Sequence, residues 1–153
     1  LAVAEEATEA SWRDLAAEGA HVLHLATHAV IDERLEPGAA LFLTPQGGDD
    51  GMLSAAEVGA TKLNADLVVL SGCRTALGST RDGQALSTLS GAFLAAGARG
   101  VVASLWEVGD EATAVFMEQF YFELARGSRE AAALRHGMEG AELGVPHIDF
   151  LYG

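Results

Sequence analysis

The chain has 153 residues, half of them hydrophobic, which suits one domain with a sizeable core and excludes a disordered or fibrous chain. Nine basic and 22 acidic residues give a net charge of −13, which argues against nucleic acid as a direct partner because phosphate backbones are repelled. A single cysteine excludes an internal disulfide and a zinc site of paired cysteines, and it fits a reducing, cytoplasmic compartment. No apolar run approaches the roughly 20 residues that span a bilayer, so we expect no membrane contact.

The predicted elements alternate between helices and strands. In chain order the patterns predict a helix over 5–18, a strand over 21–27, a short edge strand at Leu41–Leu43, a helix capped by Ser54 that ends near Leu63, a strand over 66–72, a helix over 84–96, a strand over 100–106, helices over 110–126 and 128–142, and a last edge strand after Pro146. This alternation predicts an α/β fold with a mostly parallel sheet and helices on both faces.

Three of the predicted strands end in conspicuous residues, His28, Cys73 and Trp106. Ligands lie outside the carboxyl ends of the strands in open parallel sheets, so these residues should share one edge. Strands about 4.8 Å apart would allow His28 and Cys73 to approach contact. A thiolate is a nucleophile, and a neighbouring imidazole lowers the thiol pKa and transfers protons. The pair therefore predicts a catalytic dyad, with the backbone N–H groups of Cys73 and Ala29 as oxyanion donors.

Each residue of the pair also has a structural interpretation. A lone cysteine or histidine at the end of an apolar strand is often a core residue, but a histidine about 50 residues before the cysteine is the caspase-type arrangement. His24 lies inside its strand and is predicted to belong to the core.

Other residues near the same edge are weaker candidates. Trp106 is either a core aromatic or a wall of the substrate pocket, and Ser104 lies in the same segment. Asp82 lies in the predicted loop after Cys73 and is either a turn former or a specificity group. The sequence holds no P-loop, no G-x-G-x-x-G and no G-x-S-x-G motif, so no cofactor and no metal ion are predicted.

Several segments resemble the CHAT family of caspase-like cysteine peptidases, whose clan includes caspases, separases and gingipains. The segments are His24–His28, Asp50–Glu57, Leu63–Thr75 and Ala92–Val108. The resemblance implies a three-layer caspase-like fold over residues 1–153, with His28 as general acid and base and Cys73 as nucleophile. Ala29 stands where the family usually has Gly, and its added methyl group would crowd the oxyanion site.

The resemblance also bears on context. Relatives often follow tetratricopeptide repeats, so we expect a regulatory repeat domain in a longer, bacterial protein from which this chain, beginning at Leu1, is a piece. The predicted function is hydrolysis of a protein or peptide substrate through a thioester acyl-enzyme. Two alternatives stay open: a catalytically silent interaction or regulatory module with the same fold, and a hydrolase of a small acyl substrate.

Overall fold

The computed structural model describes residues 4–31, 39–71, 82–104, 110–140 and 148–152. The chain divides into two compact units. The larger comprises Leu1–Glu107 with Asp149–Gly153, and the smaller comprises Val108–Ile148. The segments that contain the predicted dyad both belong to the larger unit.

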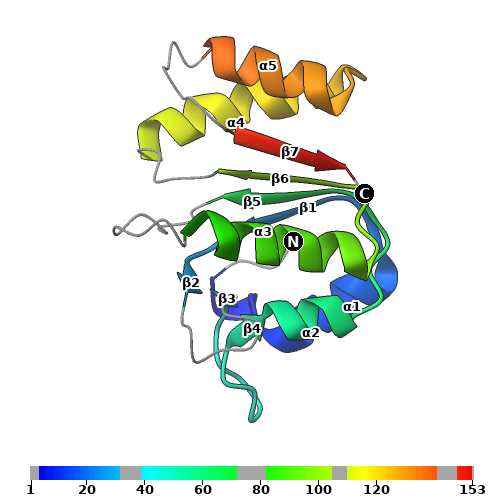
Figure 1. Ribbon diagram of the computed structural model, residues 1–153, viewed down its shortest axis with the longest axis vertical. Helices are drawn as coiled ribbons and strands as arrows, with labels where there is room; N and C mark the ends of the chain where they lie inside the picture. Colours follow the sequence, from blue (N-terminus) through cyan, green and yellow to red (C-terminus); the bar gives the residue numbers. More distant parts are fainter. Residues whose placement is uncertain (1–3, 32–38, 72–81, 105–109, 141–147, 153) are drawn as a thin grey trace. The chain divides into compact units, whose positions relative to one another are not determined.

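A sheet with parallel strands lies at the centre of the larger unit. Its strands, in spatial order, are β1 (Ala20–Ala26), β5 (Ala65–Ser71), β6 (Gly100–Ser104) and β7 (Ile148–Tyr152) (Figure 1). β1 pairs with β5 and β5 pairs with β6, both in parallel. The parallel pairing, with helices between the strands along the chain, confirms the predicted α/β class. β7 confirms that the tail ends in an edge strand.

One face of this sheet packs against helices α1 (Glu9–Glu18), α2 (Ala55–Ala60) and α3 (Asp82–Ala96). The core on this side contains Leu23, Val68, Leu70 and Val101 from the strands with Trp12, Val58 and Phe93 from the helices. The rings of Trp12 and Phe93 meet edge to face, with their centroids 5.8 Å apart. Leu67 and Val69, which alternate with these core residues of β5, are also buried, so β5 is apolar on both faces.

The ends of the helices follow from local hydrogen bonds. Ser54 caps α2 by accepting from Glu57 N, and the Glu57 carboxylate accepts from Ser54 N (2.8 Å), which confirms the predicted capping box. α2 nevertheless ends at Ala60, before Leu63, because Thr61 has an extended backbone, and Leu63 N donates instead to Ala96 O at the end of α3 (2.8 Å). Gly97 closes α3 with a positive φ of 123°, and a Cβ there would lie 2.2 Å from Leu63 O. Only glycine therefore allows this close approach of the two backbones.

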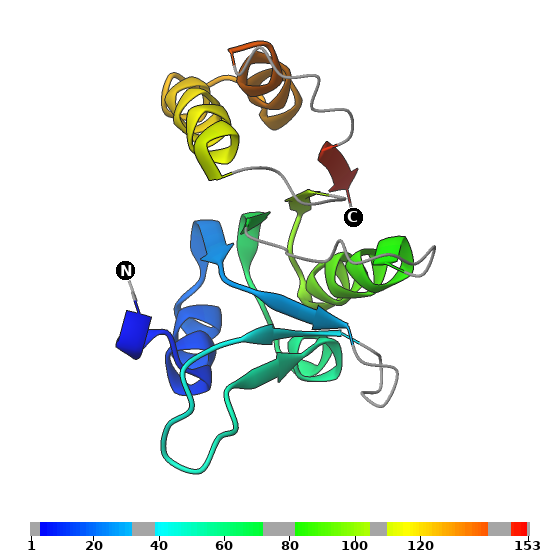
Figure 2. The same ribbon diagram turned by 90° about the vertical axis from the view of Figure 1, so that its left-hand side faces the viewer.

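A second, antiparallel sheet joins the first in the larger unit. Its strands are β2 (Ala29–Ile31), β3 (Ala39–Phe42) and β4 (Met52–Ser54), in the order β2-β3-β4 (Figure 2). The predicted strand at Leu41–Leu43 is present as β3, although it covers Ala39–Phe42, but the prediction that it lies at an edge is wrong because β3 is the central strand. Its two partners have three residues each, which is too short to show a sequence period.

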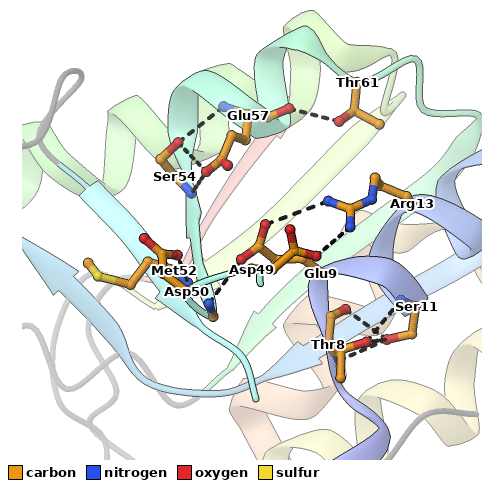
Figure 3. A network of polar contacts seen from close by, with 11 residues as sticks. Thr8, Glu9, Ser11, Arg13, Asp49, Asp50, Met52, Ser54, Glu57 and Thr61 are labelled. Carbon is orange, nitrogen blue, oxygen red and sulfur yellow. Dashed lines mark hydrogen bonds and ion pairs between the residues drawn. The ribbon is translucent and has the colours of Figure 1, made fainter. Parts of the chain in front are cut away.

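A network of polar contacts ties the loop between β3 and β4 to helix α1 (Figure 3). Gly51 N donates to Oε1 of Glu9 (3.0 Å), and Arg13 pairs with both Glu9 and Asp49. Burial raises the pKa of the Glu9 carboxyl, although the hydrogen bond from Gly51 opposes the shift. This network fixes the start of β4, and it leaves the carboxylates occupied in structural contacts.

The smaller unit contains helices α4 (Asp110–Ala125) and α5 (Glu130–Gly140). The rings of Phe116 and Phe120 stack with their centroids 5.7 Å apart, and both side chains are buried. A Cβ at Gly137 would lie 2.8 Å from the Phe116 ring, so the glycine lets α5 pack closely on α4. Within the described residues, no helix is long and apolar enough to cross a membrane.

Candidate active site

β1 and β5 end side by side, and the predicted dyad follows these two ends in the sequence. Ala26, the last residue of β1, lies opposite Ser71, the last residue of β5. The ladder continues with one more bond, from Thr27 N to Ser71 O (3.2 Å). His28 comes next in one segment, and Cys73 follows Gly72 in the other. Both segments therefore leave the sheet at its carboxyl edge, where ligands bind in parallel sheets.

The backbone of His28 is held from two sides. Its carbonyl accepts from Phe42 N (2.8 Å) in β3, and the Thr27 hydroxyl donates to the Phe42 carbonyl. Through Thr27 the same segment is also bonded to the end of β5. The His28 side chain is exposed, so its imidazole is accessible from solvent on a fixed stretch of backbone. The structure thus places His28 where the sequence predicts, just beyond the end of β1.

Ala29 directs its methyl group into the core. It is 8% exposed and shares the core with Leu41 and Leu53. Side chains alternate along a strand, so His28 faces the opposite side. Because Phe42 N donates to His28 O, the Ala29–Leu41 pair is of the non-hydrogen-bonded type, and the Ala29 N–H points away from β3. The methyl group, which we expected to crowd the oxyanion site, thus packs in the core with Leu41 and Leu53.

The remaining predicted residues are only partly covered. Cys73 and Trp106 lie outside the described residues. Ser104 ends β6 and Asp82 begins α3 rather than lying in a loop, and for both of them the backbone is described but the side chain is not. The dyad, the Cys73 oxyanion donor and the three pocket residues therefore stay predictions.

A second histidine of β1 contacts the end of β5, which sequence reasoning missed. Nε2 of His24 lies within hydrogen-bond reach of Oγ of Ser71, a residue that is 8% exposed. The His24 ring is partly exposed, and burial of the rest lowers the pKa of its imidazole below the usual 6.5. The prediction that His24 is a core residue is wrong, because it lies on the face of β1 opposite Leu23 and Leu25. The alternation of His24 with two leucines was the signal available in the sequence.

The other end of the same strand pair carries an exposed polar cluster. Nδ1 of His21 in β1 lies 2.7 Å from Oδ2 of Asp66 in β5, and Arg99 donates to Oδ1 of Asp66 (2.8 Å). The hydrogen bond with His21 lowers the pKa of the Asp66 carboxyl, and Arg99 adds to the shift. These groups lie at the amino edge of the sheet, far along the strands from His28, and they form an ordinary surface contact.

An apolar surface lies beside His28. Phe42, which is hydrogen-bonded to His28 through its backbone, is 42% exposed, and it pairs with Met52 of β4. No local pattern in the sequence predicts that Phe42 lies beside His28, because this proximity depends on the register of the small sheet. Among the described side chains, no group of three or more His, Cys, Asp or Glu residues is arranged to hold a metal ion.

Comparison with known proteins decides the family. The sequence profile of the CHAT domain matches residues 1–141. The chain belongs to the CHAT family. Because the match covers the segments with His28, Cys73 and Trp106, their resemblance to the CHAT family is confirmed. This family is related to caspase-like proteases.

Two curated relatives also match this CHAT chain. Tetratricopeptide repeat protein 28 of Mus musculus is 40% identical over 89 residues, and the protein of the same name from Homo sapiens is 39% identical over 89 residues. The matched region is 58% of this chain but only 4% of each relative. The chain therefore spans a small part of these proteins, whose names place tetratricopeptide repeats in the same polypeptide.

Proposed function

We propose that this CHAT chain is a cysteine endopeptidase with His28 and Cys73 as its catalytic dyad. The proposal includes a single peptidase domain over 1–153 with a three-layer caspase-like fold. The register of β1 and β5 is the observation that supports it most directly, because it sets Ala26 opposite Ser71. His28 and Cys73 follow these two residues at the same spacing. The two segments begin at the ends of neighbouring parallel strands, which lie about 4.8 Å apart.

The chemistry uses the histidine twice. His28 takes the proton of the Cys73 thiol, and the thiolate attacks the carbonyl carbon of the scissile peptide bond. The C–N bond breaks as the imidazolium gives its proton to the leaving amine, and a thioester remains on Cys73. His28 then takes a proton from water as the water attacks the thioester. The C–S bond then breaks, the new carboxyl end of the peptide leaves, and the His28 imidazolium returns the proton to the Cys73 sulfur.

The oxyanion of each tetrahedral intermediate needs donors that are already in place. The backbone N–H of Ala29 suits this role, because it points away from β3 and follows His28 directly. The N–H of Cys73 is the proposed second donor. The Ala29 methyl group leaves this side open, since it packs in the core.

The substrate is proposed to be an extended peptide. Phe42 offers an apolar surface for one substrate side chain beside His28. Ser104, Trp106 and Asp82 are proposed to line the rest of the pocket. In the full-length protein a tetratricopeptide repeat domain is proposed to regulate access, and the names of the matched relatives support this context. A cytoplasmic location is part of the same proposal.

The test combines labelling with cleavage. The full-length protein is treated at neutral pH with a biotinylated peptide acyloxymethyl ketone, and separately with a complex peptide library analysed by mass spectrometry. We expect labelling at Cys73, the only cysteine of the chain, and cleavage that disappears in Cys73→Ala. Cleavage of a confirmed substrate by Cys73→Ala at the normal rate would refute the proposal.

The same experiment separates the alternatives. A silent interaction module would show neither labelling nor cleavage, and its partner complex would survive loss of both His28 and Cys73. A hydrolase of small acyl substrates would release nitrophenol from p-nitrophenyl acetate in a Cys73-dependent reaction but would cleave no peptide.

A further inference from the structure

The last residue of β5 is bonded to β1 through both its backbone and its side chain. Ser71 O accepts from Thr27 N (3.2 Å), and Ser71 Oγ contacts Nε2 of His24. Ser71 is buried, so water does not satisfy its hydroxyl, and a hydroxyl left without a hydrogen-bond partner would destabilise the fold. In the sequence only Gly72 then separates Ser71 from Cys73. The contacts of Ser71 with β1 therefore fix the end of the strand from which the segment with Cys73 begins.

The contact lies on the face of β1 and β5 that points away from the packed core. Leu23 and Leu25 of β1 pack with the core, so His24 and Ala26 face the other side. On β5, Leu70 packs with the core and Ser71 faces away from it. Ser71 pairs with Ala26, so His24 reaches Ser71 diagonally, from the preceding residue of the same face of β1.

We propose that His24 is a positioning residue that, through Ser71, fixes the start of the segment bearing Cys73 and so sets the distance between its thiol and His28. This inference rests on the proposed function. His24 touches neither substrate nor reacting atoms, and it acts by holding the β5 end. Burial lowers the pKa of His24, which favours the neutral ring in its contact with Ser71.

The experiment measures the reactivity of the Cys73 thiol directly and needs no substrate. The rate of alkylation by iodoacetamide is measured from pH 5 to 10 in the full-length protein, where mass spectrometry assigns the modification to Cys73. Wild type, His28→Ala, His24→Leu, Ser71→Ala and the His24→Leu/Ser71→Ala double variant are compared. His21→Leu is the matched control, because it makes the same change on the same strand and also removes a contact with β5.

We expect His24→Leu and Ser71→Ala to lower the alkylation rate at pH 6.5 by about tenfold, as the thiol pKa returns toward that of a free cysteine, about 8.5. The double variant should fall no further than either single change, because both remove one contact. His24→Gln, which keeps a hydrogen-bonding group near the Nε2 position, should restore much of the rate. His21→Leu should match wild type.

The outcomes separate the inference from the proposed function. If Cys73 of wild type titrates as a free thiol and His28→Ala changes nothing, the dyad is absent. If His28→Ala raises the thiol pKa while His24→Leu behaves as His21→Leu does, the dyad stands and the inference is refuted. Thermal unfolding of each variant shows whether it is folded. Should His24→Leu fail to fold, Ser71→Ala and His24→Gln are compared instead. A reduced alkylation rate in Ser71→Ala with a near wild-type rate in His24→Gln supports the inference, and a wild-type rate in Ser71→Ala refutes it.

Discussion

The two ends of the β1–β5 strand pair each join a histidine of β1 to a polar residue of β5, but the two contacts differ in chemistry. At the amino edge, His21 pairs with Asp66, which also binds Arg99, and all of these groups are exposed to water. At the carboxyl edge, His24 contacts the buried Ser71 through its hydroxyl, and His28 lies four residues further along the chain. Water screens the charges at the first end, whereas the second end joins an imidazole to a buried hydroxyl. Both ends carry a histidine beside a polar residue, so residue type alone does not identify the candidate active site. The burial of the β5 residue and the direction of the strands distinguish the two ends.

The largest expected difference between the ends is in catalysis. His28→Ala should lower kcat/KM for a cleaved peptide by about 10²–10⁴-fold, because it removes the group that is proposed to transfer protons in both steps. His21→Ala should leave kcat/KM unchanged. The two variants are assayed on one substrate at pH 7. Equal activity of the two variants would show that the carboxyl edge is not the catalytic edge.

The middle of the strand pair should dominate stability. Leu70→Ala, at a side chain that is 2% exposed in the core, should lower the free energy of unfolding by about 3 kcal/mol through lost burial and a cavity. Val22→Ala on β1, at a side chain that is 40% exposed, should cost about 0.5 kcal/mol. Urea denaturation measures both. A Val22 effect as large as that of Leu70 would contradict the assignment of the core to one face of β1.

The carboxyl end should also make stability depend on pH. The pKa of His24 is lower in the folded chain than its usual 6.5, so the unfolded chain binds this proton more tightly. The contribution of neutral His24 is complete above about pH 6.5 and is lost as the pH falls. The urea midpoint should therefore decline from pH 7.5 to 5.5, and less steeply in His24→Gln. Parallel curves would show that His24 does not titrate with a lowered pKa.

The amino end should give the smallest effect. Asp66→Asn removes an exposed acceptor from both His21 and Arg99, and pairs of this kind contribute little in water. The thermal midpoint should shift by about 2 °C or less at low salt, and the shift should shrink further in 1 M NaCl. A larger, salt-independent shift would mean that the amino end is a structural anchor comparable to the contact of His24 with Ser71.

The sequence predicted the larger elements well because their signals are local. The apolar runs that form β1 and β5 were placed within one residue at each end, and Ser54 and Glu57 marked the start of α2. The short strands β2 and β4 escaped prediction, since three residues cannot display a period. The position of His28 beyond the end of β1 followed from the apolar run alone. Its contact with Phe42 did not, because that contact depends on the register of a sheet whose strands are separated in the sequence.

The core position of Ala29 has a consequence for sorting the relatives of this chain into active and inactive members. A screen that requires glycine after the histidine would reject this sequence, although the extra methyl group occupies space among Leu41 and Leu53. Glycine at this strand position would lose more conformational entropy on folding and would destabilise the strand by about 0.5–1 kcal/mol, without adding a hydrogen-bond donor. Alanine and glycine at this site therefore differ in how they fill the interior. Under the proposed function, inactive members are better identified by the loss of His28 or Cys73.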